Sequence, residues 1–268
     1  MPVGLQPLLS HIPAWLMVLF RITGIFVIAP MFGSNTIPRQ IKIFMAVGLS
    51  LCVYPMLLDA DKPSAALLAP VLSSGIPLWA LAGAVALELM IGIVIGYGAS
   101  IPLMGMQIGG RICDQQMGMG LASIYNPELS EEGGIVSQFF FILSIMLFLA
   151  LGGHRVLLST LVGSFDSVPP GGFRVDGDLF ELMLGLLDSM LSLAMRVAAP
   201  LLCLVFLQTV ALGFVARTVP QMNILSIGFP LRILVGASVL ITSLSALAIA
   251  FTDTMREALS EVSRFFGV

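Results

Sequence analysis

The sequence has little charge for its length. Only 10% of its 268 residues are Asp, Glu, Lys or Arg, whereas 58% are hydrophobic. A soluble globular domain carries roughly 25% charged residues, so this chain has too little polar surface to cover a water-facing globule. The net charge of −3 is small and no basic stripe is present, so nothing indicates a nucleic-acid partner. These deficits exclude an ordinary soluble domain.

Cysteine and the common catalytic motifs are also scarce. Cys52, Cys113 and Cys203 are odd in number, far apart and flanked by apolar residues. They predict neither a disulfide framework nor a metal site, and we interpret them as small packing residues. The chain has no P-loop, no HExxH, no paired Cys-x-x-Cys and no Ser, His and Asp in contexts typical of a triad. We therefore expect no enzyme activity, no metal and no cofactor.

Long uncharged apolar runs are what the sequence does have. Residues 63–87, 89–110 and 233–252 contain no charge, and a helix of about 20 such residues crosses the hydrocarbon core of a bilayer. The polar alternation of barrel strands is missing. The sequence therefore predicts an all-α membrane protein. About six long apolar segments are expected, at about 12–31, 41–58, 65–108, 135–151, 178–215 and 224–251.

Two regions need a more detailed prediction. Zone 65–108 is too long for one crossing, so we expect a helical hairpin or a kinked, extended helix there, followed by a glycine-rich loop over 109–134. The tail has the spacing of an amphipathic helix that lies on a surface or a partner. Its apolar positions are Met255, Leu259, Val262 and Phe266. We predict a helical domain at 1–252 and an amphipathic C-terminal helix at 253–268. The scattered positive charges leave the membrane orientation open.

Ionisable groups inside apolar segments are costly and are functional candidates. Arg21, Glu88, Asp188 and Arg196 are of this kind. They could relay protons or ions, or they could pair with each other or with another subunit, or face water in an assembly. Glu88 has no acidic neighbour at helical spacing, which favours structural pairing. His154 could be a proton switch, but its place after two glycines favours a cap or a turn.

Glycines and methionines gather in one part of the chain. The pairs Gly92 with Gly96 and Gly105 with Gly109 place small residues on one helix face, which allows close helix packing. Residues 104–123 contain four methionines and five glycines. Such a stretch could form a flexible plug that seals an irregular aperture, because Met is soft and adaptable. An ordinary mobile loop beside a Met-rich core is the other interpretation.

Three blocks resemble the FliR family of flagellar type III export-gate subunits and its virulence-system relatives, the export-apparatus T proteins. The blocks are GGRICDQQMGMGLASIYNPE at 109–128, GGHRVLLSTLVGSFDSVPPGG at 152–172 and VARTVPQMNILSIGFPLRILVG at 215–236. Each block is weak evidence alone, but the three occur in the family's order and span most of the chain. The positions that carry the structural motif are Arg21, Pro30, Pro38, His154, Pro220, Gln221, Gly228, Phe229 and Pro230.

The resemblance implies a core subunit of a flagellar export gate. Its helices would form hairpins wound into a helical hetero-oligomer with FliP-like and FliQ-like subunits, next to an FlhB-like subunit. Unfolded flagellar proteins would pass through it, in the bacterial inner membrane of the flagellar basal body. The family's central loop serves as a channel plug. The matching positions here are Met104, Met106, Gln107, Gly110, Gln116, Met117, Gly118, Met119 and Gly120.

Other functions remain possible from the sequence. The equivalent subunit of a virulence injectisome would share these blocks. A purely structural scaffold would assemble in the same way and would differ only in ion leak. A small-molecule secondary transporter would suit broken helices and intramembrane charges, but it predicts two repeated halves, which the sequence lacks.

Overall fold

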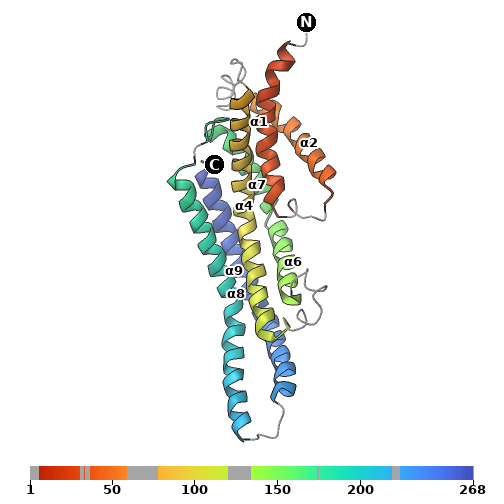
Figure 1. Cartoon of the computed structure of the whole chain (residues 1–268), viewed down its shortest axis with the longest axis vertical. Coiled ribbons are helices and arrows are strands. Elements are labelled where there is room, and N and C mark those ends of the chain that lie inside the picture. The colour runs from red at the N-terminus through yellow and green to blue at the C-terminus, as the bar shows by residue number, and fades with distance from the viewer. Residues whose placement is uncertain are drawn as a thin grey trace. The chain divides into compact units, whose positions relative to one another are not determined.

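A computed structural model describes residues 6–30, 33, 37–58, 78–119, 134–173, 175–218 and 224–267. Within these ranges every regular element is a helix (Figure 1). The helices are α1 (Gln6–Ile28), α2 (Arg39–Leu57), α4 (Leu78–Met117), α6 (Ile135–Ala150), α7 (Gly153–Ser167), α8 (Gly177–Thr218) and α9 (Ile224–Phe265). The prediction of an all-α fold is confirmed.

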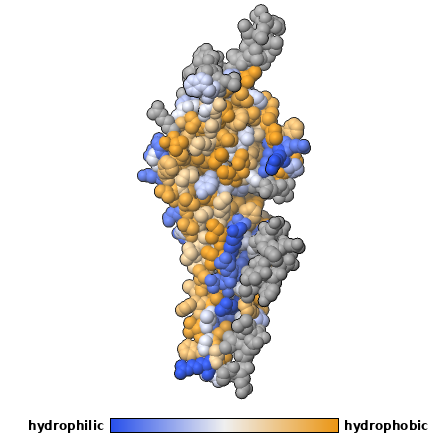
Figure 2. All heavy atoms as spheres, viewed as in Figure 1, coloured by the Kyte–Doolittle hydropathy of each residue, from blue (hydrophilic) through white to orange (hydrophobic). Residues whose placement is uncertain are grey.

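The helices have the length and composition of membrane spans. Five of them could cross a bilayer, and α6 with α7 could together make a sixth. Figure 2 shows hydrophobic residues over much of the described surface on the face that is drawn. Long, apolar helices whose outer faces are also apolar suit lipid or other apolar helices as neighbours. The chain is an all-helical membrane protein, and the prediction of about six apolar segments is confirmed.

The chain forms two compact units. Unit 1 comprises residues 1–100, 152–185 and 257–268, and unit 2 comprises 101–151 and 186–256. Each unit has its own buried side chains, which are large and apolar. In unit 1 they include Met17, Ile22, Ile95 and Phe165, and in unit 2 they include Phe140, Phe148, Leu193 and Phe251.

Helix α4 is longer than the sequence suggested. It continues without a break to Met117 and contains Pro102, so the extended-helix alternative holds for residues 78–117. The expected loop over 109–134 is wrong in its first part, because residues 109–117 are helical. Gly109 and Gly110 serve close packing against neighbouring helices rather than bending. The rest of the expected hairpin zone, 65–77, lies outside the described residues.

Helix α9 runs through the predicted boundary at 252/253, so the amphipathic tail is the last part of a longer helix. Its apolar face is buried within the chain: Leu259, Val262 and Phe266 are 7%, 1% and 1% exposed. Val262 lies against Gly98 of α4 within unit 1. The apolar side of the predicted amphipathic tail packs on the chain's own helices.

The three cysteines are free thiols. Cys113 is buried, as expected of a packing residue, whereas Cys52 and Cys203 are exposed on their helices. The packing interpretation is therefore wrong for these two within this chain, because their helices turn those faces outward.

Candidate functional site

A buried ion pair lies in unit 1. Arg21 of α1 and Glu88 of α4 both have fully buried side chains, and Arg21 Nε lies 2.5 Å from Glu88 Oε2. Arg21 also donates to Ser164 Oγ at 3.0 Å and to the Val168 carbonyl at 3.3 Å. Removing two charges from water is favourable only when their remaining hydrogen-bonding groups are satisfied. Ser164 of α7 and its C-cap residue Val168 supply that compensation, and of the alternatives left open for these ionisable groups, pairing with each other holds for Arg21 and Glu88.

The second carboxylate oxygen and the guanidinium face are also occupied. Glu88 Oε1 accepts a hydrogen bond from the Gly171 N–H at 2.9 Å, and the Arg21 guanidinium carbon lies 4.0 Å from the centre of the Phe165 ring. A cation over an aromatic face is attracted by the ring's negative face. Arg21 from the N-terminal part of the resemblance therefore meets Phe165 of the 152–172 block, and its partner Glu88 meets Gly171 of the same block.

Glycines bring α1 and α4 unusually close beside this pair. A Cβ on Gly24 would lie 2.8 Å from the Gly92 Cα, and one on Gly92 would overlap the Arg21 carbonyl oxygen. A Cβ on Gly96 would lie 3.2 Å from the Ala29 nitrogen. Figure 1 shows the two helices side by side. The predicted role of Gly92 and Gly96 in close packing is confirmed, and the partner is α1.

The C-terminal half of α4 packs in the same way in unit 2. A Cβ on Gly105 would lie 2.9 Å from the Met190 carbonyl of α8, and one on Gly109 would lie 2.7 Å from the Val197 side chain. A Cβ on Gly110 would lie 2.5 Å from the Ser137 Cα of α6. These glycines therefore allow α4 to pack closely against both α8 and α6.

Helix α4 ends in a glycine C-cap. Gly118 has a φ of 81°, its N–H donates to the Gln115 carbonyl at 3.1 Å, and the Met119 N–H donates to the Asp114 carbonyl at 3.1 Å. This pair of bonds is the Schellman arrangement, in which glycine accepts the left-handed conformation without a Cβ penalty. The Phe229 ring of α9 lies against Gly118, at 2.7 Å from a Cβ built there. Residues from the 109–128 and 215–236 blocks therefore meet in unit 2.

Two further contacts hold the end of α4. Met117 is 1% exposed and packs on Gly236 of α9, where a Cβ would lie 2.9 Å from its sulfur. Asp114 is 4% exposed, and its carboxylate accepts hydrogen bonds from the Val136 and Ser137 N–H groups at 3.0 and 2.9 Å. Those two groups belong to the first turn of α6, which has no side-chain cap of its own.

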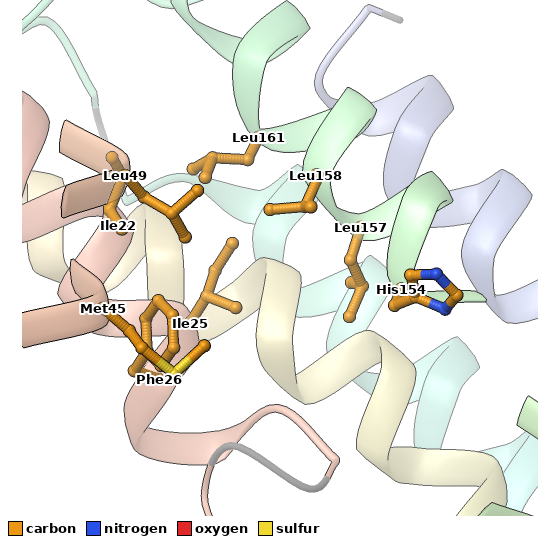
Figure 3. Close-up of a pocket in the computed structure, with 9 residues that line it drawn as sticks. All are labelled: Ile22, Ile25, Phe26, Met45, Leu49, His154, Leu157, Leu158 and Leu161. Atoms are coloured by element: carbon orange, nitrogen blue, oxygen red, sulfur yellow. The ribbon is translucent and has the colours of Figure 1, made fainter. Parts of the chain in front are cut away.

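Unit 1 also contains an apolar cavity of about 300 Å³ between α1, α2 and α7. Figure 3 shows its nine lining side chains, of which His154 is the only polar one. The His154 Nδ1 is buried and has no hydrogen-bond partner among the described residues. His154 is the second residue of α7, and the N-cap residue of that helix is Gly152, which has a φ of 69°. His154 therefore lies in the first turn of α7, and its Nδ1 makes no capping hydrogen bond there. Over the described ranges no group of three or more His, Cys, Asp and Glu could hold a metal ion.

The family described as bacterial export proteins, family 1, matches residues 12–258. That range includes the Arg21–Glu88 network, the contacts at the end of α4 and at least part of every described helix. The chain belongs to this family of bacterial export proteins.

Three relatives of this export protein are all named flagellar biosynthetic protein FliR. The Bacillus subtilis (strain 168) protein is 29% identical, over 96% of this chain and 99% of the relative. The Escherichia coli (strain K12) protein is 28% identical over 87% and 84%, and the Caulobacter vibrioides protein is 26% identical over 91% and 93%. The likeness therefore extends over most of this chain and most of each relative.

The structure places the predicted plug positions of this export protein in different environments. Met106 and Met117 are buried and Gly110 is covered by α6, whereas Met104 is 40% exposed. Gln107, Gln116, Gly118 and Met119 are half-buried, and Gly120 lies outside the described residues. Figure 2 shows a hydrophilic band over this half of α4, where Arg111 and Gln115 are exposed.

The structural-motif positions are likewise spread over both units. Pro30 is buried in the turn after α1, and Pro38 is the N-cap residue of α2. Gly228 is buried, Phe229 half-buried and Pro230 exposed on α9, while Pro220 and Gln221 lie outside the described residues. Asp188 and Arg196 are exposed on α8, unlike the paired Arg21 and Glu88.

Asp114, Ser164 and Gly134 take part in the contacts described above, but none of them had a role assigned from the sequence. An isolated acidic residue in an apolar, glycine-rich stretch that precedes a new helix was the available signal for Asp114, since a carboxylate suits a helix N-terminus. The sequence carries no comparable signal for Ser164.

Proposed function

We propose that this chain is a core subunit of a flagellar protein-export apparatus in the bacterial inner membrane. The observation that carries the proposal is the family match over residues 12–258, together with the likeness to proteins named FliR over nearly the whole chain. Apolar helices with the length of membrane spans fit such a place. The role is one of transport, without a catalytic step.

The proposed partners are FliP-like and FliQ-like subunits, an FlhB-like subunit and the unfolded flagellar proteins in transit. Large apolar side chains exposed on the chain support helix partners: Phe44, Trp79 and Phe206 are 76%, 80% and 72% exposed. A soluble monomer rarely exposes large contiguous apolar patches, whereas lipid and partner helices cover them. The proposed site of this assembly is the flagellar basal body.

We also propose that the end of α4 and the residues after it form the plug of the export channel. A closed gate must block ions, yet it must later admit polypeptides of varied shape. Among the predicted positions, Met104 and Met119 are not buried, so their flexible side chains remain available to fill an opening. Met117, Gly118 and Gly110 pack against α9 and α6, which fits an anchor that holds the plug in place. Gln116 and Gly120 belong to the same proposal.

The assembly is tested by purifying the tagged chain from its native membrane in mild detergent and identifying bound proteins by mass spectrometry. Recovery of FliP-like and FliQ-like subunits, together with loss of motility when the chain is deleted, is the expected result. A folded monomer that binds a small solute would instead support a secondary transporter. Co-purification with needle components rather than flagellar ones would assign the chain to an injectisome.

The plug is tested separately by deleting residues 116–120 and measuring ion leak across the membrane. We expect the assembly to form and the leak to increase. Met104→Ala and Met119→Ala should each raise the leak by a smaller amount, and Met195→Ala is the matched control, since Met195 is 55% exposed on α8. An unchanged leak in the deletion would leave the chain as a structural scaffold.

A further inference from the structure

We propose that Asp114 is a positioning residue that fastens the first turn of α6 to the last turns of α4 and so keeps the export channel sealed at rest. The fastening is argued from the contacts of unit 2 alone. Its effect on the seal rests on the proposed function.

The contacts are those of a helix cap supplied from a distant helix. The two carboxylate oxygens of Asp114 accept the Val136 and Ser137 N–H groups, at 3.0 and 2.9 Å and across 22 and 23 positions of sequence. These N–H groups have no partner within their own helix, because the first turn of a helix leaves its donors free. Residue 134, the N-cap position, is glycine and has no side chain to bond them. Asp114 therefore does what a local Ser, Thr or Asp does elsewhere.

Two glycines leave space for this arrangement. A Cβ on Gly134 would overlap the Asp114 carboxylate, and a Cβ on Gly110 would lie 2.5 Å from the Ser137 Cα. A larger residue at Gly110 would therefore require a shift of the α6 backbone, and one at Gly134 would displace the Asp114 side chain. The absence of side chains at these positions is an observation independent of the hydrogen bonds, and it points to the same arrangement.

The charge of Asp114 is balanced by the helix it caps. The side chain is 4% exposed, and in the described part of the chain the ion pair found is Arg21 with Glu88 and none involves Asp114. The N-terminus of a helix carries a partial positive charge that stabilises a carboxylate there. If the first turn of α6 unfolded, the buried Asp114 carboxylate would lose its hydrogen bonds. We therefore expect the end of α4 and the start of α6 to lose their native structure together.

Asp114 bonds both the residue that follows the C-cap of α4 and the first turn of α6. Its main-chain carbonyl accepts the Met119 N–H at 3.1 Å, and its side chain accepts the Val136 and Ser137 N–H groups. One residue thus holds the exit from α4 and the entry to α6 at a fixed separation. In the proposed gate the plug positions Gln116 to Met119 lie at this exit from α4, so the same contacts hold them.

The fastening is tested by hydrogen–deuterium exchange on the whole purified complex. In Asp114→Ala we expect the amides at the start of α6 to exchange roughly tenfold faster or more, because hydrogen bonds to a charged group are each worth at least that factor. Asp188→Ala is the matched control, since Asp188 is an exposed aspartate on α8 of the same unit. Wild-type exchange at residues 135–138 in Asp114→Ala overturns the proposal.

The effect on the seal is measured as ion leak in the same strains. Asp114→Ala is expected to leak several-fold more than Asp188→Ala with partners still bound, and Asp114→Asn, which keeps one acceptor oxygen, is expected to lie between them. Faster exchange without added leak overturns the role in sealing. If Asp114→Ala does not accumulate, Gly134→Ala gives the same test, because it displaces the carboxylate but leaves it present. If the proposed function is wrong, the wild-type chain will instead co-purify without FliP-like or FliQ-like subunits.

Discussion

The Arg21 guanidinium and the Glu88 carboxylate are both fully buried, and each is surrounded by further hydrogen-bonding partners. Such a pair is weak evidence of net stability, since two apolar residues of similar volume can be equally good. The loss of one partner is different, because it leaves a buried charge without compensation. The pair therefore matters to stability mainly because the loss of either partner alone is unfavourable.

Glu88→Ala should destabilise the protein by about 3–5 kcal/mol, the usual range for breaking a buried ion pair from one side. The double variant Arg21→Leu with Glu88→Leu should recover a large part of that loss. Thermal unfolding of the purified complex in detergent measures both. Arg196→Ala, at an exposed position on α8, should unfold like the wild type. A single variant as stable as the wild type would show that the pair does not form.

Gly118 and Gly152 allow backbone strain to be separated from packing. Both have positive φ, but a Cβ on Gly152 meets nothing within 4 Å, whereas one on Gly118 meets the Phe229 ring at 2.7 Å. Gly152→Ala should lower the unfolding free energy by about 1–2 kcal/mol, the left-handed penalty for alanine. Gly118→Ala should lower it further.

Adding Phe229→Leu to Gly118→Ala should restore part of the extra loss, because the smaller side chain makes room for the new methyl group. Thermal unfolding of the two single variants and the double variant provides the comparison. Equal losses for Gly118→Ala and Gly152→Ala would show that Phe229 does not press on this turn.

At the scale of elements, α4 shows how far sequence patterns reach. Its apolar composition and its glycine faces could be predicted, because both follow from local spacing, whereas the choice between a hairpin and an extended helix stayed open. Its end could not be placed, because glycine both breaks helices and allows them to approach closely. Gly109 and Gly110 look alike in sequence to Gly118, and only the neighbours Val197, Ser137 and Phe229 distinguish their roles.

The crossing of α1 and α4 gives a prediction of its own. Gly92→Ala should destabilise the protein by about 1–3 kcal/mol, since an inserted methyl group forces the helix backbones apart. Gly83→Ala is the matched control on the same helix, where a Cβ meets nothing within 4 Å. It should be neutral or stabilising by up to about 1 kcal/mol, because alanine favours helix more than glycine does. Equal stability of the two variants would contradict the close crossing.

At the scale of the whole molecule, the fold class, the number of apolar segments and the family could be predicted from sequence. Which residues of different helices contact one another could not be predicted in the same way. Arg21 pairs with Glu88 across 67 positions and with Ser164 across 143, and Asp114 reaches α6 across 22. Periodicity reports which face of a helix is apolar, but it carries no information on which other helix will cover that face.

The exposed apolar surface predicts dependence on partners. Phe44, Trp79, Ile135 and Ile241 are each at least 75% exposed. Expressed alone and extracted in mild detergent, the chain should elute as a broad, aggregating species in size-exclusion chromatography. Co-expressed with the proposed FliP-like and FliQ-like subunits from the same genome, it should elute as one sharp peak. A sharp monomer peak from the chain alone would contradict this dependence.

The Arg21 network has a consequence for biosynthesis. The ribosome makes Arg21 67 residues before Glu88 and 143 residues before Ser164. During that interval α1 carries a cation in an apolar segment without its acidic partner, which is unfavourable in a bilayer. The native place of α1 is complete only after the Gly171 N–H has also been made. Helix α1 therefore settles well after it has been made, and the nascent chain must shelter Arg21 in water, at a headgroup or beside the insertion machinery until then.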